Sequence, residues 1–133
     1  MRERGGVVAL IDHDALLRGE TERGVERVPL GLGPAWYRGW MIPSDRYTAL
    51  ARALDHRGCD LVVAPERYRA AHELPGWYSM FAEVTPMSAW SARMAGQVPD
   101  EHVLASLVGA LRRGPGIVKD SGVPRRSWTL VLR

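Results

Sequence analysis

The sequence predicts an α/β fold, and three of its segments carry that prediction. The apolar, β-branched run at residues 7–11, within "GGVVALIDHD", is typical of a buried strand. A short strand around residues 35–38, a helix over residues 45–57 and the apolar strand "CDLVVAP" then follow one another within about 30 residues. This succession is a βαβ unit, which predicts a mainly parallel sheet with a right-handed crossover.

The first predicted strand leads into a polar, less regular region. Asp12 and Asp14 follow the strand at residues 7–11 directly, and such carboxylates either bind a cation or cap the next helix. Residues 14–28 have the pattern of a helix with apolar residues on its inner side. The two glycines inside that segment weaken the prediction, because glycine disfavours a helix interior.

The helix at residues 45–57 is the best-defined element. Ser44 is a suitable N-cap, apolar residues recur at helical spacing, and Gly58 supplies a left-handed stop. The strand "CDLVVAP" begins at once and is closed by Pro65. This part of the chain therefore predicts the helix and second strand of the βαβ unit.

The second half of the chain mixes short helices with extended stretches. A polar helix is expected over residues 65–74, and Pro75 and Gly76 should break it. Large side chains follow, too many for an exposed loop: Trp77, Tyr78, Met80 and Phe81. The stretch "TPMSAW" is expected to be extended, a helix should begin after Asp100, and "GPGIVKD" reads as a buried strand.

Length and composition are those of an ordinary globular protein. The 133 residues suffice for one domain with a real core, and 46% of them are hydrophobic and 25% charged. No apolar run approaches the ~20 residues needed to span a bilayer, and the first apolar patch is too short for a signal peptide. We expect a cytoplasmic protein. Cys59 is the single cysteine and is expected to be a buried thiol.

The positive charges are almost all arginine. The formal net charge is +3, and the 18 basic residues comprise 17 arginines and one lysine, Lys119. The arginines are scattered rather than massed in a stripe, which makes a nucleic-acid partner the weakest of the functions considered. Lys119 is therefore the exception, expected where a compact ammonium serves better than an arginine fork. On a rigid strand above a glycine-rich loop, it would make a phosphate clamp.

Two further residues have alternative interpretations. Arg38, in "YRGW", either extends from the carboxyl edge of the parallel sheet to bind a carboxylate or phosphate, or stacks on Trp36 or Trp40. His72 is either an acid or base or a hydrogen-bonded structural residue. Zinc is not expected, because the four histidines are far apart and there is one cysteine. Walker, dinucleotide and nucleophile-elbow motifs are absent.

Five segments in this order resemble the bacterial ATP-grasp domain proteins, a family formerly catalogued as a domain of unknown function. They are "VALIDHDALL", "WYRGWMIPSDRYTAL", "APERYRAAHELPGWY", "TPMSAW" and "GPGIVKD", and the similarity extends from about residue 7 to residue 128. The resemblance implies a small three-layer pre-ATP-grasp-like domain at residues 1–92, with a sheet of about four strands. Residues 93–133 would then be the start of the ATP-grasp nucleotide subdomain, with a helix and a terminal strand.

The resemblance also implies a reaction and its site. Family members activate a carboxylate with ATP as an acyl phosphate, which an amine or a similar nucleophile then attacks. Lys119 matches the lysine that binds the ATP phosphates, with Asp120 beside it. The candidate substrate contacts are Arg38, His72, Trp77 and Tyr78.

This chain departs from the family pattern at both ends. Family members begin with an additional strand and helix, and continue past the lysine motif into a glutamate-bearing region that binds magnesium. We therefore expect a truncated or split ATP-grasp ligase-like protein whose magnesium ligands are absent and which is inactive alone. A second chain that supplies the rest of the fold, or self-association through an exposed strand edge, would be its partner.

A non-enzymatic function is the alternative. In that case an α/β binding module would use the aromatic side chains around Trp36, Trp40, Trp77 and Tyr78 as its partner surface. Nucleotide binding distinguishes the two functions, because the module requires no role for Lys119 in holding phosphate.

Overall fold

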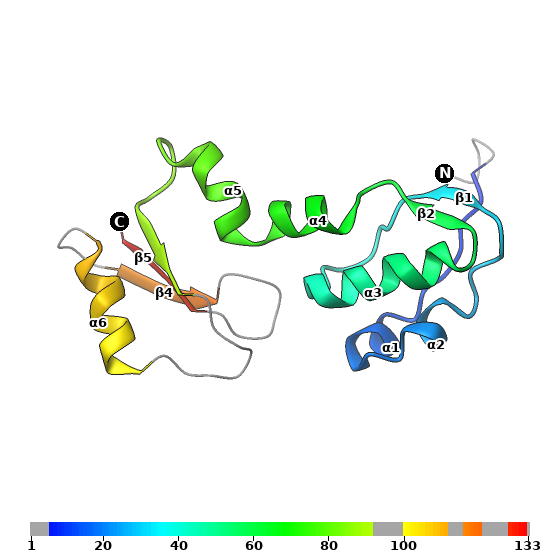
Figure 1. Ribbon diagram of the computed structural model, residues 1–133, viewed down its shortest axis with the longest axis horizontal. Helices are drawn as coiled ribbons and strands as arrows, with labels where there is room; N and C mark the ends of the chain where they lie inside the picture. Colours follow the sequence, from blue (N-terminus) through cyan, green and yellow to red (C-terminus); the bar gives the residue numbers. More distant parts are fainter. Residues whose placement is uncertain (1–5, 92–99, 112–115, 121–127, 133) are drawn as a thin grey trace. The chain divides into compact units, whose positions relative to one another are not determined.

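A computed structural model describes residues 6–91, 100–111, 116–120 and 128–132, the last two ranges as backbone. The chain divides into two compact units, Met1–Tyr68 and Arg69–Arg133, and each is described by itself. The division into residues 1–92 and 93–133 that the family resemblance implies stays a prediction. The described elements mix helices with short strands, so the α/β class is confirmed (Figure 1).

The unit Met1–Tyr68 is built around the predicted βαβ unit. Strands β1 (Gly33–Ala35) and β2 (Cys59–Leu61) are parallel, with Pro34 opposite Asp60, and helix α3 (Ser44–Asp55) connects them. The chain leaves α3 through Gly58 at a φ of 67°, which confirms the left-handed stop. The predicted N-cap is shifted by one residue: Pro43 occupies that position and Ser44 begins the helix.

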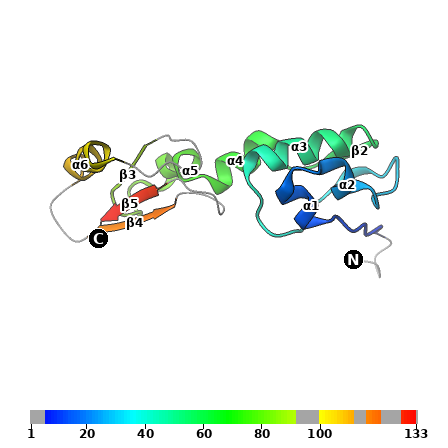
Figure 2. The ribbon, with the colours of Figure 1, turned by 90° about the horizontal axis from the view of Figure 1, so that it is seen from below.

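The helix expected over residues 14–28 is instead two short helices. These are α1 (His13–Arg18) and α2 (Thr21–Val25), which lie beside α3 (Figures 1 and 2). Gly19 ends α1 at a φ of 85°, and its N–H donates to Leu16 O. At Gly24 an added Cβ would lie 2.6 Å from Leu16 Cδ2, so α2 packs closely on α1. The glycines therefore break the segment and let its two halves fold together.

The strand expected at residues 7–11 is not formed. Val7, Val8 and Leu10 are exposed, whereas Ala9 and Ile11 are partly buried and pack against the core. In the part of the chain that the structure describes, β1 pairs with β2 alone, so this run has no ladder partner. The chain turns into α1 directly, because Asp12 N–H donates to Gly24 O and the Asp12 carboxylate accepts from Ala15 N–H at 3.0 Å.

The core of this unit lies between α3, the two short helices and the inner face of the parallel strands. Its largest fully buried side chains are Tyr47, Leu16, Ile42, Leu50, Val25 and Cys59. Cys59 is a free, buried thiol, as the sequence predicted, and its Sγ lies 3.5 Å from Pro29 O. Burial of side chains from α1, α2 and α3 in one cluster explains why such short elements stay together.

The unit Arg69–Arg133 contains a second, antiparallel sheet. Strand β5 (Trp128–Leu132) lies between β3 (Ser88–Trp90) and β4 (Gly116–Asp120), which Figure 2 shows in that order. The described residues thus form one sheet of two strands and one of three, rather than the single mainly parallel sheet of about four strands. The long crossover needed for parallel pairing is present only between β1 and β2 in the described ranges.

Three helices complete the described chain. Helix α4 (Pro65–His72) confirms the polar helix, and α5 (Leu74–Phe81) follows it where a break was expected. Pro75 lies in the first turn of α5, where a missing N–H costs no helical hydrogen bond. Met80 and Phe81 are exposed on α5, contrary to the expected packing. Helix α6 (Glu101–Gly109) begins directly after Asp100, the predicted N-cap, whose side chain accepts from Val103 N–H at 2.8 Å.

None of the helices in the described ranges is long and apolar enough to cross a bilayer.

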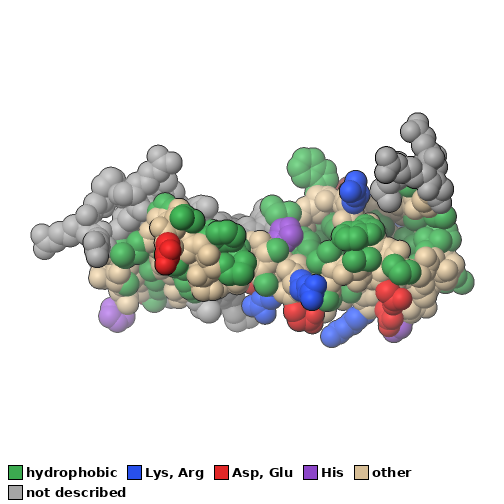
Figure 3. Space-filling model, turned by 90° about the horizontal axis from the view of Figure 1, so that it is seen from above, with side chains coloured by type: hydrophobic (Ala, Val, Ile, Leu, Met, Phe, Trp, Pro, Cys, Tyr) green, Lys and Arg blue, Asp and Glu red, His purple; other side chains and the backbone are tan. Residues whose placement is uncertain are grey.

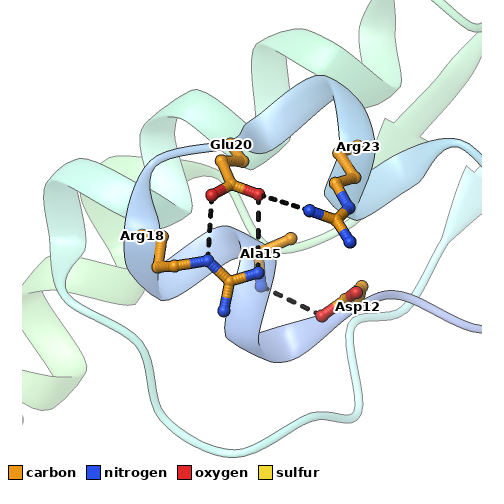
Figure 4. A network of polar contacts seen from close by, with 5 residues as sticks. All are labelled: Asp12, Ala15, Arg18, Glu20 and Arg23. Carbon is orange, nitrogen blue, oxygen red and sulfur yellow. Dashed lines mark hydrogen bonds and ion pairs between the residues drawn. The ribbon is translucent and has the colours of Figure 1, made fainter.

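A carboxylate network joins α1 to α2, and Figure 4 shows it from close by. Glu20 accepts from Arg18 Nε at 2.9 Å and from Arg23 Nη1 at 3.1 Å. The bond from Arg18 is the main cause that lowers the pKa of Glu20. The bond from Ala15 N–H likewise lowers the pKa of Asp12. Both carboxylates are therefore stabilised in their charged form where the two helices meet.

We expect acid to loosen this helix pair. Because both pKa values are lowered in the folded state, their contribution to stability is complete above the unfolded values of about 4, and is lost as pH falls through the folded values. Asp12→Asn keeps an acceptor for Ala15 N–H but cannot titrate. Its melting temperature should therefore depend less on pH below about 4 than that of the wild type. Glu22→Gln, outside the network, is the control, and identical acid profiles for all three proteins would contradict the expectation.

Candidate functional site

Three tyrosines gather beyond the carboxyl ends of β1 and β2. Tyr37 follows β1, Tyr47 lies in the first turn of α3, and Tyr68 comes from α4. The Tyr47 and Tyr68 rings stack with centroids 3.8 Å apart and planes at 6°, and Tyr37 meets Tyr47 edge to face at 5.9 Å. Such contacts hold the rings in one arrangement. In open α/β folds this edge of a parallel sheet is where ligands bind.

The tyrosine hydroxyls fix the backbone around them. Tyr68 Oη accepts from Ile42 N–H and donates to Ile42 O, both at 3.0 Å. Tyr47 Oη donates to Val63 O at 2.9 Å, and Tyr37 Oη donates to Trp40 O at 2.8 Å. The loop from β1 to α3 is therefore tied to the core at Tyr37, Trp40 and Ile42.

These phenols are hydrogen-bond donors rather than bases. Burial raises the pKa of Tyr37 to about 12, and the neighbouring Tyr68 and Tyr47 add to the increase. Burial is also the main cause that raises the pKa of Tyr47 and of Tyr68. All three side chains are accordingly protonated at neutral pH, and their role at this edge is to position the loop.

The same loop presents large side chains to solvent. Trp36 is 63% and Trp40 83% exposed, and Arg38 lies between them in sequence. Among the described residues Arg38 has no hydrogen bond and no ion pair, so its guanidinium is available to an anion. The structure therefore places Arg38 at the predicted edge of the sheet.

The aromatic residues of the other unit form a separate group. Trp77 lies 6.5 Å from Tyr78 and 6.3 Å from Phe81 on α5, measured between ring centroids. Tyr78 meets Trp90 of β3 edge to face at 5.3 Å, and its hydroxyl accepts from Ser88 N–H at 3.2 Å. The structure thus brings Trp77 and Tyr78 together and attaches α5 to β3. Both are half-buried.

His72 and the lysine motif are placed by the backbone. His72 is the last residue of α4 and is half-buried. Lys119 and Asp120 end β4, which lies at the edge of the sheet formed by the described strands, and they pair with Thr129 and Trp128 of β5. The strand predicted for "GPGIVKD" is thus confirmed over Gly116–Asp120, and the glycine and proline loop that follows lies outside the described residues.

The first carboxylates of the chain serve as a cap. Asp12 caps α1 and Asp14 lies in its first turn, which confirms the capping interpretation for Asp12. No group of three or more histidine, cysteine, aspartate or glutamate side chains suited to a metal occurs in the described ranges. His13 Nδ1, between the two carboxylates in sequence, is buried without a hydrogen-bond partner in this part of the chain.

Sequence reasoning missed two features of these sites. It did not foresee that Tyr68 would stack on Tyr47 and bond to Ile42. The available signal was that α3 follows one parallel strand and α4 follows the other, each with a tyrosine in its first turn. It also missed the contact of Trp90 with Tyr78, which depends on how β3 returns to α5.

Comparison of the chain with models of protein families, with curated proteins and with solved structures found no match.

Proposed function

We propose that this chain is an ATP-grasp ligase-like protein that binds nucleotide phosphates through Lys119. The observation that supports this best is the position of Lys119 and Asp120 at the end of β4, a regular strand paired with β5. A strand held by five consecutive residue pairs fixes the position of its backbone, which a phosphate clamp requires. The resemblance of five ordered sequence segments to ATP-grasp domain proteins also supports the proposal.

In this proposal the two positively charged candidate residues have different tasks. The ammonium of Lys119 offsets the negative charge of the phosphates. Arg38, within the unit Met1–Tyr68, is the candidate contact for a carboxylate. In reactions of this class ATP transfers its γ-phosphoryl group to a carboxylate and ADP leaves. An amine then attacks the acyl phosphate and displaces inorganic phosphate. The described residues do not fit a magnesium site, so the proposal assigns no step to that ion.

Calorimetric titration with ATP tests the role of Lys119. Lys119→Ala should weaken binding about ten- to a hundredfold, the range expected when one charge-assisted hydrogen bond is lost. Lys119→Arg keeps the charge but changes its shape, and should recover part of the affinity. Arg67→Ala removes one exposed positive charge from α4 and is the matched control. Equal affinity for ATP in the wild type and Lys119→Ala would exclude Lys119 from the phosphate site.

A binding module without catalysis is the second candidate. It is favoured by the exposure of Trp36 and Trp40 on a loop whose backbone is fixed by tyrosine hydroxyls. Exposed tryptophans on a rigid frame are typical of partner surfaces, because little side-chain or backbone entropy is lost on binding. Absence of ATP binding in both the wild type and Lys119→Ala would favour this function.

A further inference from the structure

The parallel pair in the unit Met1–Tyr68 has one covered face and one open face. On the covered face, Cys59, Leu61 and Val63 point into the core, and Tyr37 packs against it. The residues between them are exposed, and they define what we call the outer sheet face: Pro34, Trp36, Arg38, Asp60 and Val62. The alternation continues past the end of β1 as far as Arg38, and Val62 N–H still donates to Ala35 O at 3.0 Å.

The outer sheet face is apolar for a surface exposed to water. Parallel sheets are almost always covered on both faces, because their strands are buried by the elements that cross over them. Here α3 covers one face, while Trp36 is 63% and Val62 44% exposed on the other. Figure 3 shows hydrophobic side chains gathered over the part of this unit that carries β1 and β2, with charges of both signs beside them.

The two charged residues of the outer sheet face, Arg38 and Asp60, make this face complementary to a second copy of itself. Asp60 of β2 lies opposite Pro34 of β1, and Arg38 follows Pro34 by four residues. At about 3.3 Å per extended residue the backbone positions of the two residues are about 13 Å apart along the strands. Neither has an ion-pair partner among the described residues. A two-fold axis perpendicular to the strands, in the plane of the interface, therefore brings each Arg38 to the level of Asp60 of the second copy, about one strand spacing of 4.8 Å to its side and within reach of a long arginine side chain.

We infer that the outer sheet face is the contact surface of a homodimer. Two such faces pack Trp36 and Val62 of one copy against those of the other, and two symmetric pairs of Arg38 and Asp60 fix the antiparallel orientation. The partner is a second copy of this chain, because the outer sheet face carries both a basic residue, Arg38, and an acidic residue, Asp60, and so complements itself. A partner with a purely acidic surface would repel Asp60, and a partner with a purely basic surface would repel Arg38. This inference rests on the binding-module function proposed above and is independent of nucleotide binding.

Sedimentation velocity across a series of protein concentrations tests the dimer by charge reversal. Arg38→Asp and Asp60→Arg should each weaken dimerisation about ten- to a hundredfold, because each converts two attractive pairs into repulsive ones. The double variant, Arg38→Asp with Asp60→Arg, should restore the wild-type dimerisation constant. Arg52→Asp makes the same charge change on α3, away from this face, and should leave dimerisation unchanged.

The possible results separate this inference from the function on which it rests. A wild-type protein that stays monomeric at the highest soluble concentration would overturn the homodimer but would leave a binding module for another partner standing. A dimer that the single reversals do not weaken, or that the double variant does not restore, would also overturn the assignment to this face. Far-ultraviolet circular dichroism of each variant confirms that the comparison is between folded proteins.

Discussion

Tyr68→Phe should lower the free energy of unfolding by about 1–3 kcal/mol, the cost of leaving a buried hydrogen-bonding group without a partner. The hydroxyl of Tyr68 serves both the N–H and the carbonyl of Ile42, whose side chain is completely buried. Phenylalanine keeps the stacked ring over Tyr47 and removes these two bonds. Urea denaturation monitored by circular dichroism gives the change in free energy directly.

Tyr37→Phe is the matched control for that measurement. It also deletes one hydroxyl that bonds to a backbone carbonyl, that of Trp40, but this bond lies at the exposed surface. Water can replace the lost donor there, so the expected change is smaller than at Tyr68. If the two variants lost the same stability, the buried bridge at Ile42 would not be the feature that distinguishes them.

Leu50→Ala should destabilise the unit Met1–Tyr68 by about 2–5 kcal/mol, as is usual when a buried leucine is truncated. Leu50 is completely buried on α3, within the cluster that joins the helices to the strands. Leu10→Ala is the matched substitution in the segment that the sequence assigned to a buried strand. Leu10 is 68% exposed, so its truncation should change stability by no more than about 0.5 kcal/mol.

This pair of leucines decides between the sequence and the structure at residues 7–11. A large loss of stability in Leu10→Ala would show that the run is packed as a core strand after all. Thermal unfolding of both variants at one pH and ionic strength is sufficient, because the expected effects differ severalfold. In this segment, truncation should lower stability at Ala9 and Ile11, because these side chains pack against the core.

Local signals predicted the elements that depend on local chemistry. The βαβ unit follows from periodicity, Gly58 and a short apolar strand, and Asp100 acts as the N-cap that its position indicated. The run at residues 7–11 has strand composition, but a strand needs a neighbour with free peptide groups, and composition does not report one. Pro75 indicates a break by its residue type alone, although the first turn of a helix accepts proline.

The candidate site was predictable to a different extent in each unit. Arg38 lies where the rule for parallel sheets places a ligand-binding residue, because that rule depends only on strand direction. The order of β3, β5 and β4 was not predictable, since no strand was expected at "WTLVL". The long-range stacking of Tyr68 on Tyr47 also required the path of α4, which no local pattern specifies.

The order of strands in the second sheet has a consequence during synthesis. Strand β5 is the last described element along the chain, yet it lies between β3 and β4 and pairs with both. Neither β3 nor β4 has another partner among the described strands, so this sheet cannot form until the ribosome has released residues 128–132. The parallel pair is complete once Leu61 has emerged. The unit Met1–Tyr68 should therefore fold first on the ribosome and the unit Arg69–Arg133 second. Until β5 is available, the aromatic side chains of α5 lack the complete sheet against which they pack.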